Sequence, residues 1–353
     1  MENIMKRMTK LTAVSMAAVI AAASLTACGS SASPATTEKA AETSAASAES
    51  AAPAGASGDK QFKVGICQLV QHSALDAATK GFVDVLKEKY GDNVVIDEQN
   101  AQGDSATCTT IINGFVSNEY DLILANATPA LQAAMNATQD IPILGTSVTD
   151  YGTALAMDNF DASKGTGINV SGTSDLAPLE QQEDMILEIV PDVKKVSILY
   201  CSAEANSKYQ ATEIGKYLKE DGIEYQEFTF ADSNDLQSVV QSAVADCNAL
   251  YIPTDNTAAS NMTVVTNIAQ PAGIPIICGE ENMMMSGGLA TLSISYEDLG
   301  RATGEQAIEI LSNGADVKTM PIAYASATTK EYNKAYADAI GITMPSDYKA
   351  LEK

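Results

Sequence analysis

The chain has 353 residues, with 21 Lys and Arg against 45 Asp and Glu, a formal net charge of −24 and a single histidine. This acidic balance argues against a nucleic-acid partner, because neutralising phosphates requires a basic face. One histidine and no tight acidic cluster disfavour a metal site, and no cofactor is expected.

The N-terminus has the features of a secretory signal. Lys6, Arg7 and Lys10 precede an apolar stretch over residues 11–23, which is too short to be a comfortable membrane span. Small residues then lead to Cys28, as in a bacterial lipobox. The sequence therefore predicts a lipoprotein signal over residues 1–28, lipid attachment at Cys28, and anchoring on the extracytoplasmic face of the cell membrane.

Residues 29–60 are almost wholly Ala, Ser, Thr, Glu, Pro and Gly. Such a segment cannot bury enough apolar surface to offset the entropy of ordering. We expect a flexible tether between the membrane and a folded body that starts at residue 61.

Apolar strand patterns then alternate with amphipathic helix patterns, as in a parallel α/β sheet. The predicted strands are 62–69, 94–97, 121–125, 141–144, 196–200, 224–230, 249–252, 274–278 and 289–293. The predicted helices are 74–90, 106–117, 129–138, 179–189, 207–219, 236–245 and 296–311.

One pattern occurs twice in the folded body. Residues 63–88 and 195–220 align without a gap, and both end in Leu-Lys-Glu; a second pair starts at Asp121 and Asn248. Two similar α/β halves predict two Rossmann-like lobes with a cleft between them. Lobe one is expected to contain residues 61–170 plus 291–320, and lobe two residues 171–290 plus 321–353, so that several crossings form a hinge.

Ligands of parallel sheets bind at the carboxyl ends of the strands. Lobe one offers hydroxyl groups and helix starts there, which suit a carboxylate, whereas lobe two offers acidic groups, which suit an ammonium group. An amino acid carries both. The alternative at each loop is that residues such as Thr128 and Asp255 only cap helices. The candidate ligand-binding residues are Gln71, His72, Ser73, Thr128, Ser147, Ser202, Glu204, Asn206, Asp255, Asn256 and Glu280.

Four segments, 71–77, 200–207, 253–257 and 279–281, resemble the substrate-binding lipoproteins of ABC transporters for tryptophan and tyrosine. The family's usual acidic residue and proline in the first loop are replaced here by Gln71 and Ser73. The resemblance implies a type I periplasmic-binding-protein fold, a monomer that binds tryptophan, tyrosine or phenylalanine, and delivery to a permease driven by a separate ATPase.

Two other functions stay open at this point. The same fold hosts binding proteins for sugars and nucleosides, and it also serves surface sensors that present a ligand to a receptor. An enzyme is disfavoured: no catalytic residues are predicted, because His72 is the only possible histidine base and nothing in the sequence places a nucleophile beside it.

Overall fold

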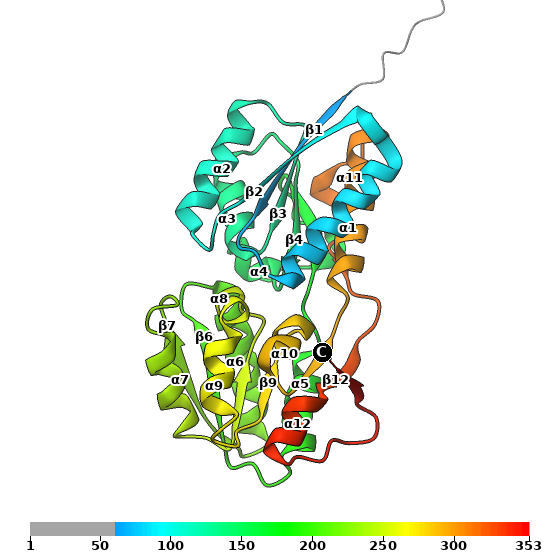
Figure 1. The fold of residues 1–353 in the computed structure, drawn as a ribbon. Helices are drawn as coiled ribbons and strands as arrows, with labels where there is room; N and C mark the ends of the chain where they lie inside the picture. Colours follow the sequence, from blue (N-terminus) through cyan, green and yellow to red (C-terminus); the bar gives the residue numbers. More distant parts are fainter. Residues whose placement is uncertain (1–60, 353) are drawn as a thin grey trace, which may run out of the picture. The chain divides into compact units, whose positions relative to one another are not determined.

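The computed structural model describes residues 61–352, which form an α/β structure with two sheets (Figure 1). The predicted signal, Cys28 and the predicted tether lie outside the described residues. Within residues 61–352, no helix is long and apolar enough to cross a membrane.

The first sheet has six strands in the order β11-β5-β4-β3-β1-β2, and its pairings are parallel. Its strands are β1 (Phe62–Gln68), β2 (Val94–Asn100), β3 (Leu122–Asn126), β4 (Ile143–Val148), β5 (Val170–Ser174) and β11 (Ala323–Tyr324). Its helices are α1 (Ser73–Tyr90), α2 (Ser105–Ser117), α3 (Thr128–Ala137), α4 (Tyr151–Ala154) and α11 (Tyr296–Asn313), with short turns η1 (Gly91–Asn93), η2 (Ala162–Lys164) and η3 (Val317–Thr319). We call this sheet and its helices lobe one.

The second sheet has seven strands in the order β13-β12-β10-β9-β8-β6-β7. Its strands are β6 (Lys195–Cys201), β7 (Glu224–Phe230), β8 (Ala249–Ile252), β9 (Ile276–Cys278), β10 (Ala290–Ser293), β12 (Thr329–Asn333) and β13 (Lys349–Leu351). Its helices are α5 (Leu179–Ile189), α6 (Ala205–Glu220), α7 (Leu236–Val244), α8 (Asn256–Ser260), α9 (Met262–Ala269), α10 (Glu281–Gly287) and α12 (Lys334–Ile340). This sheet and its helices form lobe two.

The two lobes repeat the same arrangement, which confirms the α/β prediction of two similar halves. The order β5-β4-β3-β1-β2 in lobe one matches β10-β9-β8-β6-β7 in lobe two. The repeat extends to single side chains. Asp121 accepts a hydrogen bond from the backbone N–H of Lys63 (2.8 Å), and Asn248 accepts one from Lys195 (3.1 Å). In both lobes, the residue before the third strand thus fixes the start of the first.

Strand β5 was not among the strands predicted from the sequence. The strand is fully buried although it consists of Val, Ser, Gly, Thr and Ser. Its hydroxyl groups are hydrogen-bonded: Ser171 to the carbonyl of Met320, Thr173 to Thr303, and Ser174 to the carbonyl of Thr149. A strand that buries paired polar groups has no apolar pattern by which the sequence could reveal it.

The chain passes between the lobes three times. The crossings follow β5, β10 and β11, as the sheet memberships of the flanking strands require. The expected boundaries after residues 170, 290 and 320 fall a few residues before these crossings. Strand β12 pairs antiparallel with β10, unlike the parallel sheet that was predicted. The reason is that β10 runs toward the crossings, whereas β12 starts from one and runs away.

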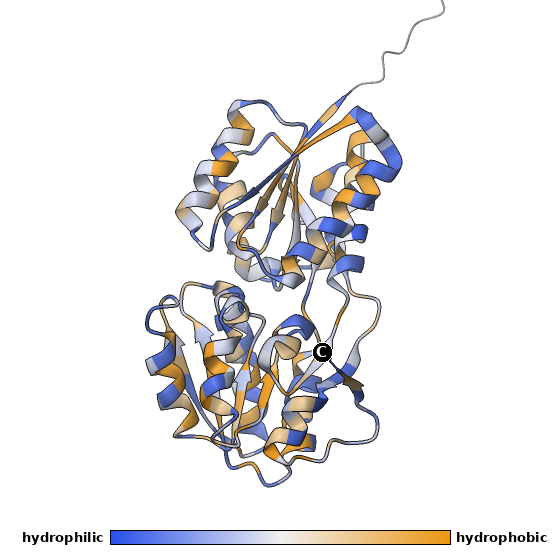
Figure 2. Cartoon of the chain, in the orientation of Figure 1, coloured by the Kyte–Doolittle hydropathy of each residue, from blue (hydrophilic) through white to orange (hydrophobic). Residues whose placement is uncertain are grey.

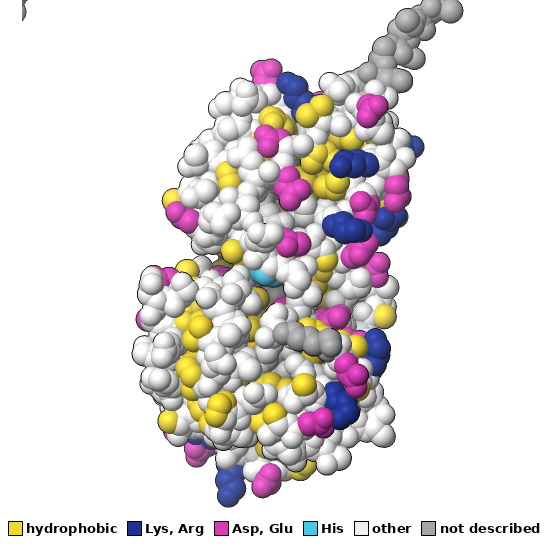
Figure 3. All heavy atoms as spheres, viewed as in Figure 1, with side chains coloured by type: hydrophobic (Ala, Val, Ile, Leu, Met, Phe, Trp, Pro, Cys, Tyr) yellow, Lys and Arg dark blue, Asp and Glu magenta, His cyan; other side chains and the backbone are white. Residues whose placement is uncertain are grey.

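Each sheet carries a hydrophobic core, and apolar residues concentrate on the strands and on the helix faces toward them (Figure 2). On the face shown in Figure 3, Lys and Arg side chains lie among Asp and Glu rather than in a patch. Helices α1 and α11 pack closely side by side in lobe one. A Cβ atom on Gly300 would lie 2.0 Å from the carbonyl oxygen of Ala78, so only glycine permits this approach.

Candidate functional site

Loops at the carboxyl ends of strands from both sheets meet in a narrow cavity of about 10 Å³. This volume is close to the minimum that holds one water molecule. His72, Leu75 and Ser147 line it from lobe one, Asp175 from the first crossing, and Tyr296 from the start of α11. Lobe two contributes a further set: Asn206, Thr254, Asp255, Asn256, Ala259 and Glu280.

The structure brings six of the predicted site residues together in this cavity: His72, Ser147, Asn206, Asp255, Asn256 and Glu280. Glu204 lines a neighbouring cavity of about 260 Å³, which shares Asn256 and has Leu69, Val70 and Pro129 on its lobe-one side. Thr128 is buried at the start of α3 and lines neither cavity, although its neighbour Pro129 lines the larger of the two. Gln71, Ser73 and Ser202 are exposed and line neither of these two cavities, and the Ser202 hydroxyl donates to the carbonyl of Phe230.

The acidic residues of lobe two are hydrogen-bonded within their own lobe. Glu204 accepts four hydrogen bonds, from the backbone and side chains of Asn256 and Thr257, at 2.7–3.0 Å. Asp255 accepts from the backbone N–H groups of Ala258 and Cys201, and thereby caps α8. Their carboxylates therefore join the loops after β6 and β8.

Glu280 has the same role at α10, where it accepts from the backbone N–H groups of Asn282 and Met283. Burial raises the pKa of Asp255 to about 8 and that of Glu280 to about 7, and the backbone hydrogen bonds oppose this rise. The alternative considered for Asp255, that it caps a helix, describes what its carboxylate contacts here.

Four residues that line the narrow cavity each carry a buried polar atom without a hydrogen-bond partner among the described residues. These atoms are His72 Nδ1, Ser147 Oγ, Asp175 Oδ1 and Asn206 Oδ1. Each such group costs about 1–3 kcal/mol when it is left unpaired. Four of them around one cavity between two lobes indicate a binding site for a polar group.

The hydrogen bonds around His72 fix its tautomer. The Asn256 amide nitrogen donates to Glu204, so the Asn256 amide oxygen faces His72 Nε2, at 3.1 Å. That oxygen can only accept, which places the proton on Nε2 and leaves Nδ1 as an acceptor. Burial lowers the pKa of His72, against the hydrogen bond to Asn256 and the charges of Glu204 and Asp76. The neutral imidazole of His72, a residue that lines the cavity, therefore keeps an unpaired acceptor at Nδ1.

The lobe-one side has a second feature, a helix start without a side-chain cap. Helix α3 follows Ala127, whose φ is 91°, and no side chain caps its N-terminus. The Thr128 hydroxyl there is buried and unpartnered. Ser147 also has a positive φ, 54°. Non-glycine residues in this conformation are strained, and such strain gathers at ligand sites.

Asp175 and Tyr296 belong to the cavity but were not among the predicted site residues. Asp175 follows β5, the strand that the sequence did not reveal, and Tyr296 was read only as the first residue of a helix. The sequence held no signal for Asp175, because the burial of the strand before it has no apolar pattern. Its Oδ2 accepts a hydrogen bond of 2.8 Å from the Tyr296 hydroxyl.

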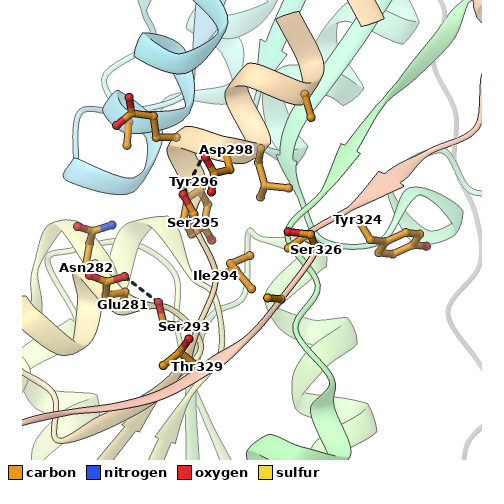
Figure 4. A pocket seen from close by; sticks show the side chains of 16 residues that line it. Glu281, Asn282, Ser293, Ile294, Ser295, Tyr296, Asp298, Tyr324, Ser326 and Thr329 are labelled. Atoms are coloured by element: carbon orange, nitrogen blue, oxygen red, sulfur yellow. Dashed lines mark hydrogen bonds between the residues drawn. The ribbon is translucent and has the colours of Figure 1, made fainter. Parts of the chain in front are cut away.

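A larger cavity of about 490 Å³ lies at the second and third crossings (Figure 4). Its walls include Ile294, Ser295 and Tyr324, and Tyr296 lines both this cavity and the narrow one. Glu281 is paired here with the Ser293 hydroxyl at 2.7 Å. None of the unpartnered atoms found in the described residues belongs to its walls. Within residues 61–352, no group of three or more His, Cys, Asp or Glu is placed to hold a metal ion.

Comparison with known proteins gives consistent results. A curated tyrosine-binding protein of Clostridioides difficile is 41% identical over 266 residues, which cover 74% of this chain and 76% of that protein. A Streptococcus pneumoniae ABC domain, solved in complex with L-Trp, is 35% identical with a TM-score of 0.77, and the match covers 81% of this chain and 97% of that one.

A Clostridium difficile substrate binding protein with adhesive properties, solved in a ligand-free open form, is 39% identical. Its TM-score is 0.63, over 83% of this chain and 99% of that one. Although its sequence is more similar, it superposes less well than the L-Trp complex.

These neighbours have the type I periplasmic-binding-protein fold, as the sequence predicted. The family described as ABC transporter substrate binding protein matches residues 63–351, which is nearly the whole described part of the chain. The chain belongs to the ABC transporter substrate binding protein family.

Proposed function

We propose that this protein is the extracytoplasmic substrate-binding component of an ABC importer and that it holds an aromatic amino acid between its two lobes. The observation that carries the proposal is the set of four unpartnered polar atoms around one interlobe cavity. A ligand with both donor and acceptor groups would pair them. Relatives named for tyrosine binding or solved with L-Trp support an aromatic amino acid as that ligand.

The carboxylate of the ligand binds on the lobe-one side. The uncapped start of α3 offers backbone N–H groups and the positive end of the helix dipole, both of which favour an anion. The buried hydroxyls of Thr128 and Ser147 are unpartnered and are available to donate. Lobe one thus supplies neutral donors rather than a basic side chain.

The aromatic ring lies in the neighbouring cavity of about 260 Å³. Its walls carry apolar groups from both lobes, including Leu69, Val70, Pro129 and Ala203. Ligand pockets in proteins are mostly apolar and start at about 300 Å³, so this space fits one ring. Because the narrow cavity is so small, the lobes must move apart before the ligand can enter.

The remaining parts of the proposal come from the sequence. Cys28 anchors the protein to the cell membrane through lipid, residues 29–60 form the tether, and a permease with a separate ATPase receives the ligand. The protein acts as a monomer and catalyses no reaction.

Calorimetric titration of the purified protein tests the proposed ligand class. L-tyrosine, L-tryptophan and L-phenylalanine should be compared with a neutral sugar and a nucleoside. We expect at least one aromatic amino acid to bind with a micromolar or lower Kd, equivalent to about −8 kcal/mol or better. The chain contains no tryptophan, so the fluorescence of bound L-tryptophan provides a second readout.

Binding of the sugar or nucleoside with no response to aromatic amino acids would favour the alternative ligand class. A matched pair of variants locates the site. Thr128→Val removes an unpartnered hydroxyl at the α3 start, whereas Thr110→Val removes one that is exposed on α2 and bonded to its own helix. Affinity should fall about tenfold in the first variant and stay unchanged in the second.

A further inference from the structure

Three of the unpartnered atoms around the narrow cavity are hydrogen-bond acceptors. They are Asp175 Oδ1, Asn206 Oδ1 and His72 Nδ1. The Asn206 amide nitrogen donates to the carbonyl of Thr254 at 2.9 Å, so the unpartnered atom of this lining residue is its oxygen. No Lys or Arg lines this cavity. The group that satisfies all three atoms must therefore be a donor.

Asp175 is the acidic residue of this set. It is 2% exposed, and its Oδ2 is held by the Tyr296 hydroxyl. A buried carboxylate is costly unless it meets a cation or is fully hydrogen-bonded. Burial raises the pKa of Asp175, and the hydroxyls of Tyr296 and Thr149 and the backbone N–H of Asp175 oppose the rise. An approaching cation would stabilise the ionised form that burial disfavours.

The other acidic side chains near the cavity already accept hydrogen bonds within lobe two. Each carboxylate of Glu204, Asp255 and Glu280 accepts at least two hydrogen bonds, chiefly from backbone N–H groups. Moving one of them toward a ligand would leave buried N–H groups unpaired, at about 1–3 kcal/mol each. Asp175 would break no such hydrogen bond on meeting a ligand, because its Oδ1 has no partner among the described residues.

From these contacts we infer that Asp175 is the counter-charge for the ammonium group of the amino acid. Asn206 and His72 provide the other two hydrogen-bond acceptors for that group. An ammonium group has three N–H donors, which matches the three acceptors. The cavity of about 10 Å³ has room for a group of about the size of one water molecule. This assignment rests on the proposed function and replaces the acids that the sequence suggested for this role.

The three residues belong to different parts of the molecule, so a ligand that binds all of them would hold the two lobes together. His72 follows β1 in lobe one, Asn206 lies in α6 of lobe two, and Asp175 lies in the first crossing. An ammonium group bound by all three joins both lobes and the hinge. A ligand without this group would lack these contacts, and it should close the lobes less effectively.

A comparison of two probes in three proteins tests the inference. The probes are L-tyrosine and 3-(4-hydroxyphenyl)propanoate, which lacks the amino group but keeps the ring and the carboxylate. The variants are Asp175→Asn and Glu183→Gln, with the wild type as reference. Glu183 is the matched control because it is also buried, with one unpartnered oxygen, but it does not line the cavity.

We expect Asp175→Asn to weaken L-tyrosine binding by about 30-fold or more, as for loss of one partner of a buried charge pair. Its affinity for the probe without the amino group should stay within about threefold of wild type. Glu183→Gln should bind both probes as the wild type does. Equal losses for both probes in Asp175→Asn, or an unchanged Kd for L-tyrosine, would overturn the assignment.

A second variant covers the case in which Asp175→Asn does not fold. Asn206→Ala removes one acceptor and should reduce the preference for L-tyrosine over the other probe about tenfold. An unchanged preference in this variant would also overturn the assignment. Failure of the proposed function looks different, since the wild type itself would then bind no aromatic amino acid.

Discussion

Buried acidic residues in this protein have two kinds of surroundings. The carboxylates of Asp255 and Glu280 accept backbone N–H groups at helix starts. Asp175 and Glu183 each keep one oxygen without a partner among the described residues. In the sequence, Asp175, Asp255 and Glu280 look alike, because an acid before a helix can either cap it or bind a ligand, whereas Glu183 lies within α5. Only the positions of the surrounding N–H groups separate the two roles.

The cost of burying Glu183 can be tested through the pH dependence of the protein's stability. Burial raises its pKa to about 7, and the charges of Asp221, Asp184 and Glu180 add to the rise. In the unfolded chain a glutamate ionises near its ordinary value of about 4.3. Between these values the folded state holds more protons, so the contribution of Glu183 to stability falls as pH rises. Replacing it with glutamine removes this loss.

We therefore expect Glu183→Gln to gain stability relative to the wild type between pH 5 and pH 8, measured by urea unfolding. Glu305→Gln is the control, because Glu305 is exposed on α11 and is not among the charges that raise the pKa of Glu183. Its difference from the wild type should change little with pH. If the Glu183→Gln difference were the same at both pH values, Glu183 would not titrate in this window.

At the level of secondary structure, the sequence predicted those elements whose burial follows an apolar pattern. Strands β1 and β6 and their helices were predicted within a few residues, because one side of each helix is apolar. Strand β5 was missed, since its buried groups are hydroxyls paired with other segments. Helix α8 was read as a loop, because five residues are too few to show a helical period.

The candidate site was predictable to the level of loops rather than of atoms. Strand ends are fixed by topology, so six of the predicted residues do meet in one cavity. Which atom of each residue faces the cavity depends on hydrogen bonds between distant segments. The bond from Tyr296 to Asp175 joins residues 121 positions apart, and nothing in the local sequence indicates it.

The α1–α11 contact gives a prediction about packing. In Gly300→Ala, the new Cβ would lie 2.0 Å from the Ala78 carbonyl oxygen, so the two helix backbones would have to separate. Overpacking of this kind costs about 1–3 kcal/mol. Gly114→Ala in α2 is the control, because nothing lies within 4 Å of the added carbon. That substitution should stabilise the protein by about 0.5–1 kcal/mol.

Chemical denaturation of both variants, compared with the wild type, provides the measurement. The two midpoints should move in opposite directions. A Gly300→Ala protein as stable as the wild type would show that α11 can shift away from α1 at no cost.

For the protein as a whole, three crossings and a nearly closed cavity imply movement between the lobes. An amino acid cannot pass into a space of about 10 Å³ unless the lobes separate first. Within residues 61–352, the side-chain hydrogen bonds between the lobes include His72 with Asn256, at 3.1 Å, and Gln210 to Thr149, at 3.4 Å, and bonds this few can break readily. A hinge that opens in the absence of ligand is the expected behaviour.

Small-angle X-ray scattering on the purified protein can detect this movement. Without ligand, we expect a larger radius of gyration than the present arrangement of residues 61–352 would give. Saturating L-tyrosine should reduce it, because the ligand binds both lobes. Identical scattering curves with and without a ligand that binds by calorimetry would mean that the lobes stay closed and that the ligand enters by another route.

The order in which the chain visits the two sheets has a consequence for how the protein is made. The first sheet needs β11, at residues 323–324, and the second needs β12 and β13, which end at residue 351. A nascent chain therefore cannot complete the first sheet until residue 324 has left the ribosome, or the second until residue 351 has. Both sheets stay incomplete while most of the described residues are being synthesised.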